Sequence, residues 1–187
     1  EPTGLFLVAP RAALNIKAKG AALEAGFDAD VEISGRKSHL TADMILPPKD
    51  GPPSGTLTIS GIDLRALAAN APKFAALKDL PVIAGITSRF AFAPGGKLAT
   101  ADFSATAEGE VPFALLKGKI LHVDLLKIAG RYDSLAHRLN ISAADLIAGE
   151  IKTQFKGNAA FTYDDAGKLQ AVGGDLDASR LSIDAPG

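Results

Sequence analysis

The chain has 187 residues, of which 47% are hydrophobic and 22% charged, and it contains neither cysteine nor tryptophan. Disulfide and thiolate-metal proteins are therefore excluded, and a net charge of −1 provides no basic field for nucleic acid or anionic lipid headgroups. Mean hydropathy is high, at +0.17, yet the longest charge-free stretches fall far short of the ~18–20 apolar residues of a membrane helix. The apolar residues are therefore spread along the chain.

Alternation with a period of two dominates the first third of the chain. In 23–33 every odd position is apolar and the even positions are polar or glycine, which predicts one amphipathic strand of ~36 Å at ~3.3 Å per residue. The alternation resumes in 40–46 and stops at the Pro- and Gly-rich loop 47–55. A further strand is predicted over 56–60.

A helical insertion is predicted at about 63–79. Asp63 is a suitable N-cap, and the apolar spacing predicts two short helices, 63–70 and 73–79, ended by Pro81. Beyond them, strands at 86–92 and 99–107 flank a Pro-Gly-Gly-Lys turn and predict a hairpin.

The remaining strands are predicted at about 111–117, 119–132, 135–142, 151–163 and 169–183. A bulge is expected where Leu125 and Leu126 break the alternation. The predicted fold class is mainly β, as a long-stranded, curved antiparallel sheet with one or two short helices. Such a sheet either forms an open, taco-like groove or closes as a sandwich.

Residues of the types that catalysis needs are not arranged in a recognisable motif. There is no cysteine nucleophile, no nucleophile elbow and no phosphate-binding loop. A metal site from His122, Asp124, Asp133 and His137 can be drawn, but it lacks a ligand-spacing signature. Asp28, Asp30 and Glu32 share one strand face and are interpreted as a solvated outer face, paired with lysines from a neighbouring strand. We therefore expect a protein that is not an enzyme and has no metal or cofactor. An enzyme, such as a carbohydrate-active β-protein, is the least favoured of three hypotheses for the function.

The apolar strand face is the informative feature. A sandwich would bury two such faces against each other, whereas an open curved sheet would leave the face to bind acyl chains. Strands of eleven or more residues and the many alanines on this face favour the open sheet. The candidate lining residues are Phe27, Val31, Ile33, Phe90, Phe92, Phe103, Phe155 and Phe161.

Two segments resemble a known family. One is Leu57–Leu64, which reads Leu-Thr-Ile-Ser-Gly-Ile-Asp-Leu and leads into an Ala- and Leu-rich helix; the other is Val123–Asp133, followed by His137-Arg138-Leu139. Both resemble the AsmA-like superfamily, and in particular the central domain of unknown function in YhdP-type and TamB-like envelope proteins. The resemblance implies a long periplasmic β-structure with a hydrophobic groove, carried by an inner-membrane helix and involved in moving phospholipid towards the outer membrane.

On this basis we expect residues 1–187 to be a single β-rich domain, an internal fragment of a larger, inner-membrane-anchored protein in the periplasm of a Gram-negative bacterium. Its expected partners are phospholipid acyl chains and other envelope proteins, and not nucleic acid. The expected function is to hold or conduct acyl chains in support of outer-membrane lipid homeostasis. The alternative is a structural or assembly domain of the envelope with a closed core.

Overall fold

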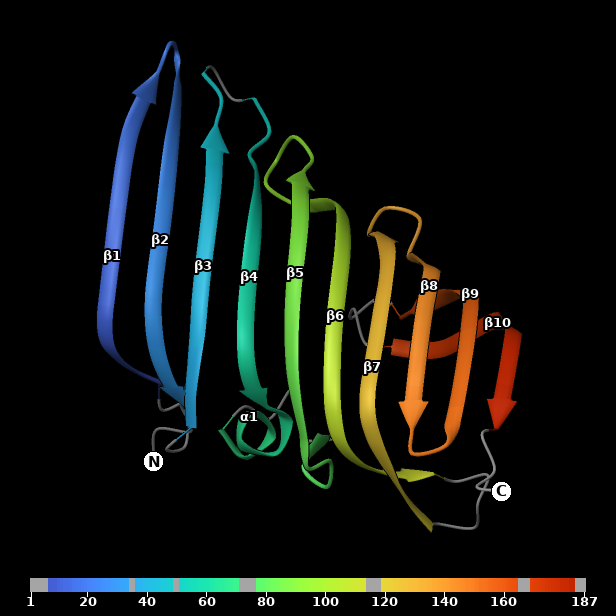
Figure 1. Cartoon of the computed structure of the whole chain (residues 1–187). Helices are drawn as coiled ribbons and strands as arrows, with labels where there is room; N and C mark the ends of the chain where they lie inside the picture. The colour runs from blue at the N-terminus through green and yellow to red at the C-terminus, as the bar shows by residue number, and fades with distance from the viewer. Residues whose placement is uncertain are drawn as a thin grey trace.

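A computed structural model describes residues 7–33, 36–48, 51–70, 77–113, 119–164 and 169–183. They form one antiparallel sheet of ten strands, in which spatial order follows chain order from β1 to β10 (Figure 1). The strands and the single helix α1 have the bounds β1 Leu7–Lys19, β2 Ala22–Ile33, β3 Arg36–Leu46, β4 Ser54–Asp63, α1 Leu64–Asn70, β5 Val82–Phe92, β6 Leu98–Phe113, β7 Lys119–Asp133, β8 Arg138–Ala148, β9 Ile151–Tyr163 and β10 Leu169–Ile183.

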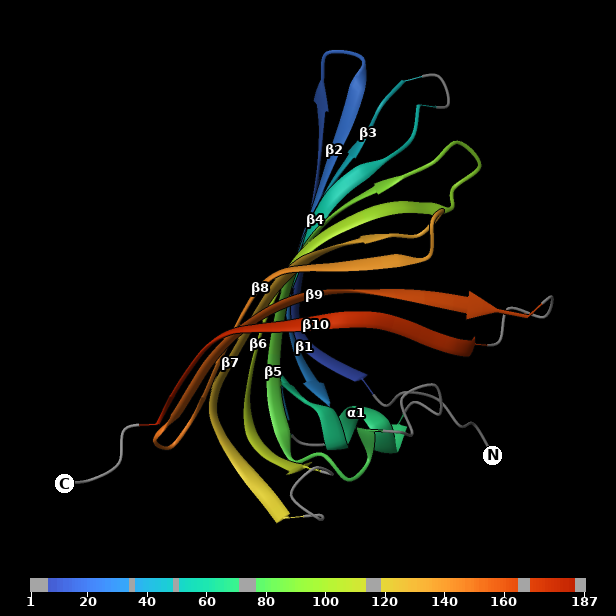
Figure 2. The same cartoon turned by 90° about the vertical axis from the view of Figure 1, so that its right-hand side faces the viewer.

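The sheet is strongly twisted and open. Viewed along its edge, the strands fan out from β1 to β10 and bend along their length (Figure 2), as the right-handed twist of successive strands accumulates. Extensive contacts join only neighbouring strands, and α1 packs on β4 and β5. The expected long-stranded, curved antiparallel sheet is confirmed; the sandwich is not formed by the described residues.

Bulges contribute to the bending. The register of β4 with β5 shifts between Ile59 and Ile62, around Gly61 at φ 72°, and that of β6 with β7 shifts next to Gly109 at φ 139°. Both φ values favour glycine, and a Cβ at Gly109 would also meet the carbonyl oxygen of Pro81. In the shift between β6 and β7 the extra residue belongs to β7 and lies next to Leu125, where the sequence predicted a bulge.

The first predicted helix is confirmed as α1. Asp63 caps it, because its Oδ1 accepts the N–H of Arg65 at 3.0 Å and of Ala66 at 3.1 Å, while Oδ2 pairs with Nε of Arg36 at 3.0 Å. The helix lies at the end of β4 and β5 (Figure 1), where Ala68 and Val82 are buried. Most of the second predicted helix, 73–79, lies outside the described residues.

Three strand predictions need correction. β1 was not predicted, although Leu14, Ile16 and Ala18 alternate with polar residues. The segment 111–113 is not a separate strand but the end of β6, which continues past Gly109 opposite the bulge of β7; 114–118 lie outside the described residues. The predicted strand 135–142 starts later, at Arg138, because Asp133 Oδ1 accepts the N–H groups of Leu135 and Ala136 and holds a turn there.

The open sheet exposes more surface than a compact protein of its mass. The accessible area is 12588 Å², whereas a compact monomer of this size exposes ~8,400 Å². A single layer with no covering layer explains the excess, since each strand face has neighbours only within the sheet. In a single open layer, the apolar residues behind the high mean hydropathy must lie on one or both faces of the sheet.

Candidate functional site

The strand register arranges the side chains of each face in rows that cross all ten strands. The central row of one face consists of Leu14, Phe27, Ala42, Leu57, Ser88, Phe103, Gly130, Ile141, Gly157 and Leu176. The row towards the β1–β2 turn consists of Ile16, Ala25, Met44, Gly55, Phe90, Ala101, Tyr132, Leu139, Ala159 and Gly174. The row on the other side consists of Ala12, Ala29, Leu40, Ile59, Ile86, Ala105, Ile128, Ala144, Phe155 and Ala178.

These three rows define what we call the apolar face. Only Ser88 and Tyr132 among their members carry a side-chain oxygen or nitrogen. On the opposite, polar face one row has no apolar side chain on any strand: Asn15, Gly26, Asp43, Thr56, Arg89, Asp102, Arg131, Asn140, Asn158 and Asp175. The apolar face is therefore continuous from β1 to β10.

Seven of the eight predicted lining residues occupy positions on the apolar face; the side chain of the eighth, Ile33, lies outside what the structure describes. Phe27 and Phe103 lie in its central row, and Phe90 and Phe155 in the two rows beside it. The remaining three continue the face beyond these rows: Val31, Phe92 and Phe161.

Two ring contacts confirm that the outer aromatic residues belong to this face. Phe92 meets Phe90 edge to face, with ring centroids 5.5 Å apart, and Phe161 meets Tyr132 in the same way at 6.1 Å. Burial differs among the predicted residues. Phe27 is 37% exposed and Val31 4%, while Phe90, Phe103 and Phe155 are half-buried.

Two aromatic rings lie against glycines of the neighbouring strand. A Cβ built on Gly55 would be 2.9 Å from Cζ of Phe90, and one built on Gly130 would be 2.9 Å from Cζ of Phe103. In both pairs the glycine stands directly opposite the phenylalanine. Because the glycine leaves room for the ring, the aromatic side chains lie low over the sheet and do not divide the apolar face into separate compartments.

No second layer covers the apolar face within the described residues. No large side chain among the described residues is fully buried. The buried hydrophobic residues are all small or β-branched: Ala29, Val31, Ala68, Val82, Val123, Ala144 and Ala148. Only α1 packs on the sheet, at the end of β4 and β5. An apolar molecule could therefore reach most of this face without displacing part of the protein.

A polar cluster lies at one end of the apolar face. Tyr132 hydrogen-bonds to Tyr163, and burial together with this bond raises the pKa of Tyr132 above its usual value. The ring of His137, in the β7–β8 turn at φ 52°, lies 5.0 Å from that of Tyr163. The sequence interpretation included neither tyrosine among the lining residues, although each continues the alternation of its strand, and it missed Leu14 and Ile16 with β1.

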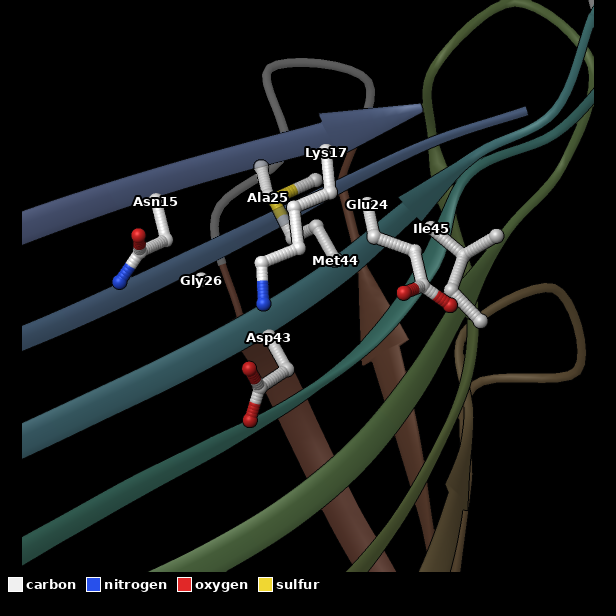
Figure 3. Close-up of a pocket in the computed structure, with 8 residues that line it drawn as sticks. All are labelled: Asn15, Lys17, Glu24, Ala25, Gly26, Asp43, Met44 and Ile45. Atoms are coloured by element: carbon white, nitrogen blue, oxygen red, sulfur yellow. The ribbon is translucent and has the colours of Figure 1, made fainter. Parts of the chain in front are cut away.

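Charged groups are concentrated on the polar face. Nδ1 of His39 lies 2.9 Å from Oδ1 of Asp30, Nε2 of His39 lies 3.6 Å from Oδ2 of Asp28, and Arg11 approaches both carboxylates at 3.8–3.9 Å. Asp28 and Asp30 thus have partners on the neighbouring strands, but these are Arg11 and His39 and not the expected lysines. A hollow on this side is lined by Asn15, Lys17, Glu24 and Asp43 around Gly26, which has no side chain to fill it (Figure 3).

The metal site that could be drawn from four residues does not form. Nε2 of His122 lies 3.7 Å from Oδ1 of Asp124, but Asp133 and His137 belong to the opposite end of β7. Nowhere in the described part of the chain do three or more His, Asp or Glu side chains gather with metal-binding geometry. The described helix is also too short to span a membrane.

Comparisons with known proteins add no further constraint. Protein-family models, curated proteins and solved structures were each searched, and none of the three searches gave a match.

Proposed function

We propose that this chain is a periplasmic segment of an AsmA-like inter-membrane bridge that holds or conducts phospholipid acyl chains on its apolar face. The observation that carries the proposal is the apolar face itself, whose three rows run without interruption over ten strands; within the described part of the chain, the only element outside the sheet that packs on it is α1, at the end of β4 and β5. The sequence resemblance supplies the envelope setting. Support of outer-membrane lipid homeostasis and an inner-membrane anchor in the parent protein belong to the same proposal.

The chemistry required is passive. Transfer of a methylene group from water to an apolar surface contributes up to ~0.8 kcal/mol, so a chain of many methylenes binds without any polar anchor. Every position of the central row except Ser88 is an apolar residue or glycine, and none carries a charge. An acyl chain displaced by one strand therefore exchanges one apolar contact for another, and sliding changes its free energy little.

The competing proposal is a structural or assembly domain of the envelope. In its closed-core form it requires a layer over the apolar face, and the described residues provide none. A partner protein that covers this face would satisfy the same apolar surface. The two proposals differ in what copurifies with the protein and in what the isolated chain binds.

The test compares two variants at adjacent positions on opposite faces. Phe103→Asp places a charge in the central row of the apolar face, whereas Ser104→Asp places it on the exposed polar face. Binding of a fluorescent fatty-acid analogue is measured for both variants and for the wild type, together with native mass spectrometry of protein purified from cells.

The proposal expects saturable binding by the wild type, a loss of at least tenfold in affinity for Phe103→Asp and unchanged affinity for Ser104→Asp. Circular dichroism and thermal unfolding of the two variants exclude loss of fold as the cause. Absence of bound lipid in the purified wild type together with absence of saturable binding would refute the proposal. An equal loss in both variants would place the binding elsewhere.

A further inference from the structure

The polar cluster at one end of the apolar face has four members: Tyr132, Ser134, His137 and Tyr163. The hydroxyl of Tyr132 hydrogen-bonds with the side chains of Tyr163 and Ser134, and the ring of His137 lies 5.0 Å from that of Tyr163. Three hydroxyl groups and an imidazole therefore meet at the margin of a face that is otherwise almost entirely apolar. A few polar groups beside a large apolar surface are typical of a site that orients an amphiphilic ligand.

The β7–β8 turn holds two members of the cluster in place (Figure 1). Besides the bonds of the turn to Asp133, the N–H of Ser134 donates to the carbonyl of Ala99 on β6 at 2.9 Å. The carbonyl of His137 accepts the N–H of Phe161 on β9, also at 2.9 Å. The turn is thus tied to the strands on both sides of the β7–β8 hairpin, so its backbone fixes where the side chains of Ser134 and His137 begin.

His137 stands in a backbone conformation that glycine adopts more easily. Its φ of 52° is the single positive value among the non-glycine residues that the structure describes. A side chain in this region costs free energy relative to glycine. A functional role of the imidazole ring would explain why histidine stands at a position that suits glycine better.

The cluster has hydrogen-bond donors to spare. Burial and the bond to Tyr163 raise the pKa of Tyr132, whereas the bond to Ser134 lowers it. A tyrosine that donates is harder to ionise and one that accepts is easier to ionise, so Ser134 donates to Tyr132 and Tyr132 donates to Tyr163. The proton of Tyr163 is then left over, on a residue that is 38% exposed. The exposed ring of His137 adds a second donor, because either neutral tautomer carries one N–H.

A strip of the apolar face leads away from the cluster along β9. After Tyr163 its side chains are Phe161, Ala159, Gly157 and Phe155, over a length of ~26 Å at ~3.3 Å per residue. The hydrocarbon core of a bilayer is ~30 Å thick and contains two opposed chains, so one acyl chain needs ~15 Å. The strip is therefore long enough for an acyl chain whose head lies at the cluster, and the alanine and glycine leave its middle free of large side chains.

We propose that the polar cluster binds the phosphate group of a phospholipid whose acyl chain lies along β9 on the apolar face. The inference rests on the proposed function and adds the part of the lipid that the apolar face does not contact. The O–H of Tyr163 and a ring N–H of His137 donate to phosphate oxygens, which are strong acceptors because they are charged. The nearby Asp133 is held by the N–H groups of the turn and stands opposite Arg138 on the polar face. The cluster thus orients the lipid with its head at the β7–β8 turn.

The test separates the head of the ligand from its chain. Dodecylphosphocholine and dodecyltrimethylammonium share a 12-carbon chain, but the first has a phosphodiester and the second has no hydrogen-bond acceptor. The affinity of each is measured below micelle formation, by displacement of the apolar dye 1-N-phenylnaphthylamine from the 187-residue chain. Inorganic phosphate in excess over dodecylphosphocholine is the third arm, because it offers the same oxygens without a chain.

Three variants are compared with the wild type. Tyr163→Phe removes one hydroxyl and keeps the ring, and His137→Gly removes the imidazole while it suits the φ of 52°. The matched control, Thr162→Val, removes a hydroxyl from the adjacent, exposed position of β9 on the polar face. Circular dichroism and thermal unfolding check the fold of each variant.

Tyr163→Phe and His137→Gly are each expected to weaken dodecylphosphocholine binding by about 3–10-fold and to leave dodecyltrimethylammonium binding within about twofold of the wild type. Thr162→Val should change neither, and inorganic phosphate should not compete. Unchanged dodecylphosphocholine affinity in both cluster variants, or equal losses for the two amphiphiles, would overturn the phosphate site while acyl-chain binding stands. Competition by inorganic phosphate would identify a site for the free anion and would overturn the lipid assignment.

Absence of saturable binding of both amphiphiles by the wild type would refute the proposed function together with this inference. Loss of fold in one cluster variant shows in the circular dichroism, and the other variant then decides the test.

Discussion

The dependence of affinity on acyl-chain length is the most direct consequence of an open apolar face. A methylene buried on all sides contributes ~0.8 kcal/mol, but a chain that lies on one uncovered layer is contacted from one side, which reduces the value to ~0.4 kcal/mol. That corresponds to a factor of ~2 in Kd per methylene. Between 12 and 16 carbons, four methylenes would then change the affinity ~15-fold.

The assay is competition of saturated fatty acids with 12, 14 and 16 carbons against a fluorescent fatty-acid analogue, at concentrations below micelle formation. A fully enclosed tunnel predicts a much steeper change, of ~200-fold over the same four methylenes. Binding through the carboxylate alone predicts no change with length. A flat series would refute acyl contact with the apolar face, and the steep series would show that a further layer closes over it.

Three further predictions follow from individual contacts. Gly130→Ala should destabilise the fold by about 1–3 kcal/mol in urea unfolding, because the added Cβ would meet the Asn140 carbonyl and the Phe103 ring. The control Gly173→Ala, whose Cβ would have nothing within 4 Å, should change stability by ~0.5 kcal/mol or less. Equal losses in the two variants would contradict the close approach of Phe103 and Asn140 to Gly130. Asp63→Ala should cost about 1–2 kcal/mol in the same assay, because it removes the cap of α1 and the ion pair with Arg36; no loss would show that the cap does not stabilise the fold. The chain has two tyrosines, so in the Tyr163→Phe variant an ultraviolet titration reports Tyr132 alone. The pKa of Tyr132 should then fall part of the way towards its usual value, because the hydrogen bond to Tyr163 is lost but burial, the larger cause of the increase, remains. The stability that Tyr132 contributes is fully present below its unfolded pKa of about 10.0 and is lost as pH rises through the higher folded value, so a wild-type fold equally stable on both sides of this range would contradict the assignment.

The alternation of residues predicted most of the strands and the membership of the apolar face. Phe27, Phe103 and Phe155 were assigned to the face from period two alone, and the register places them there. The same pattern could have located β1, where Leu14 and Ile16 alternate with Asn15 and Lys17.

What covers the apolar face could not be predicted in this way. Period two shows which side of a strand is apolar, but a sandwich and an open sheet share that pattern. The choice depends on the connections between strands. Each strand pairs with its predecessor, even across the longer β4–β5 connection that contains α1, so the described chain does not cross over to form a second sheet.

The strict neighbour-to-neighbour order of the strands has a consequence for folding. Each strand pairs with those adjacent in sequence, and no pairing joins distant parts of the described chain. Contacts of short sequence separation form rapidly, and architectures whose units contact only their neighbours fold by propagation from a local nucleus. Such a sheet frays from its two ends inwards, so hydrogen exchange should be fastest in β1 and β10 and slowest in the strands between them. Growth by another hairpin would leave every existing contact in place, and length in this architecture can change without redesign of the strands already there.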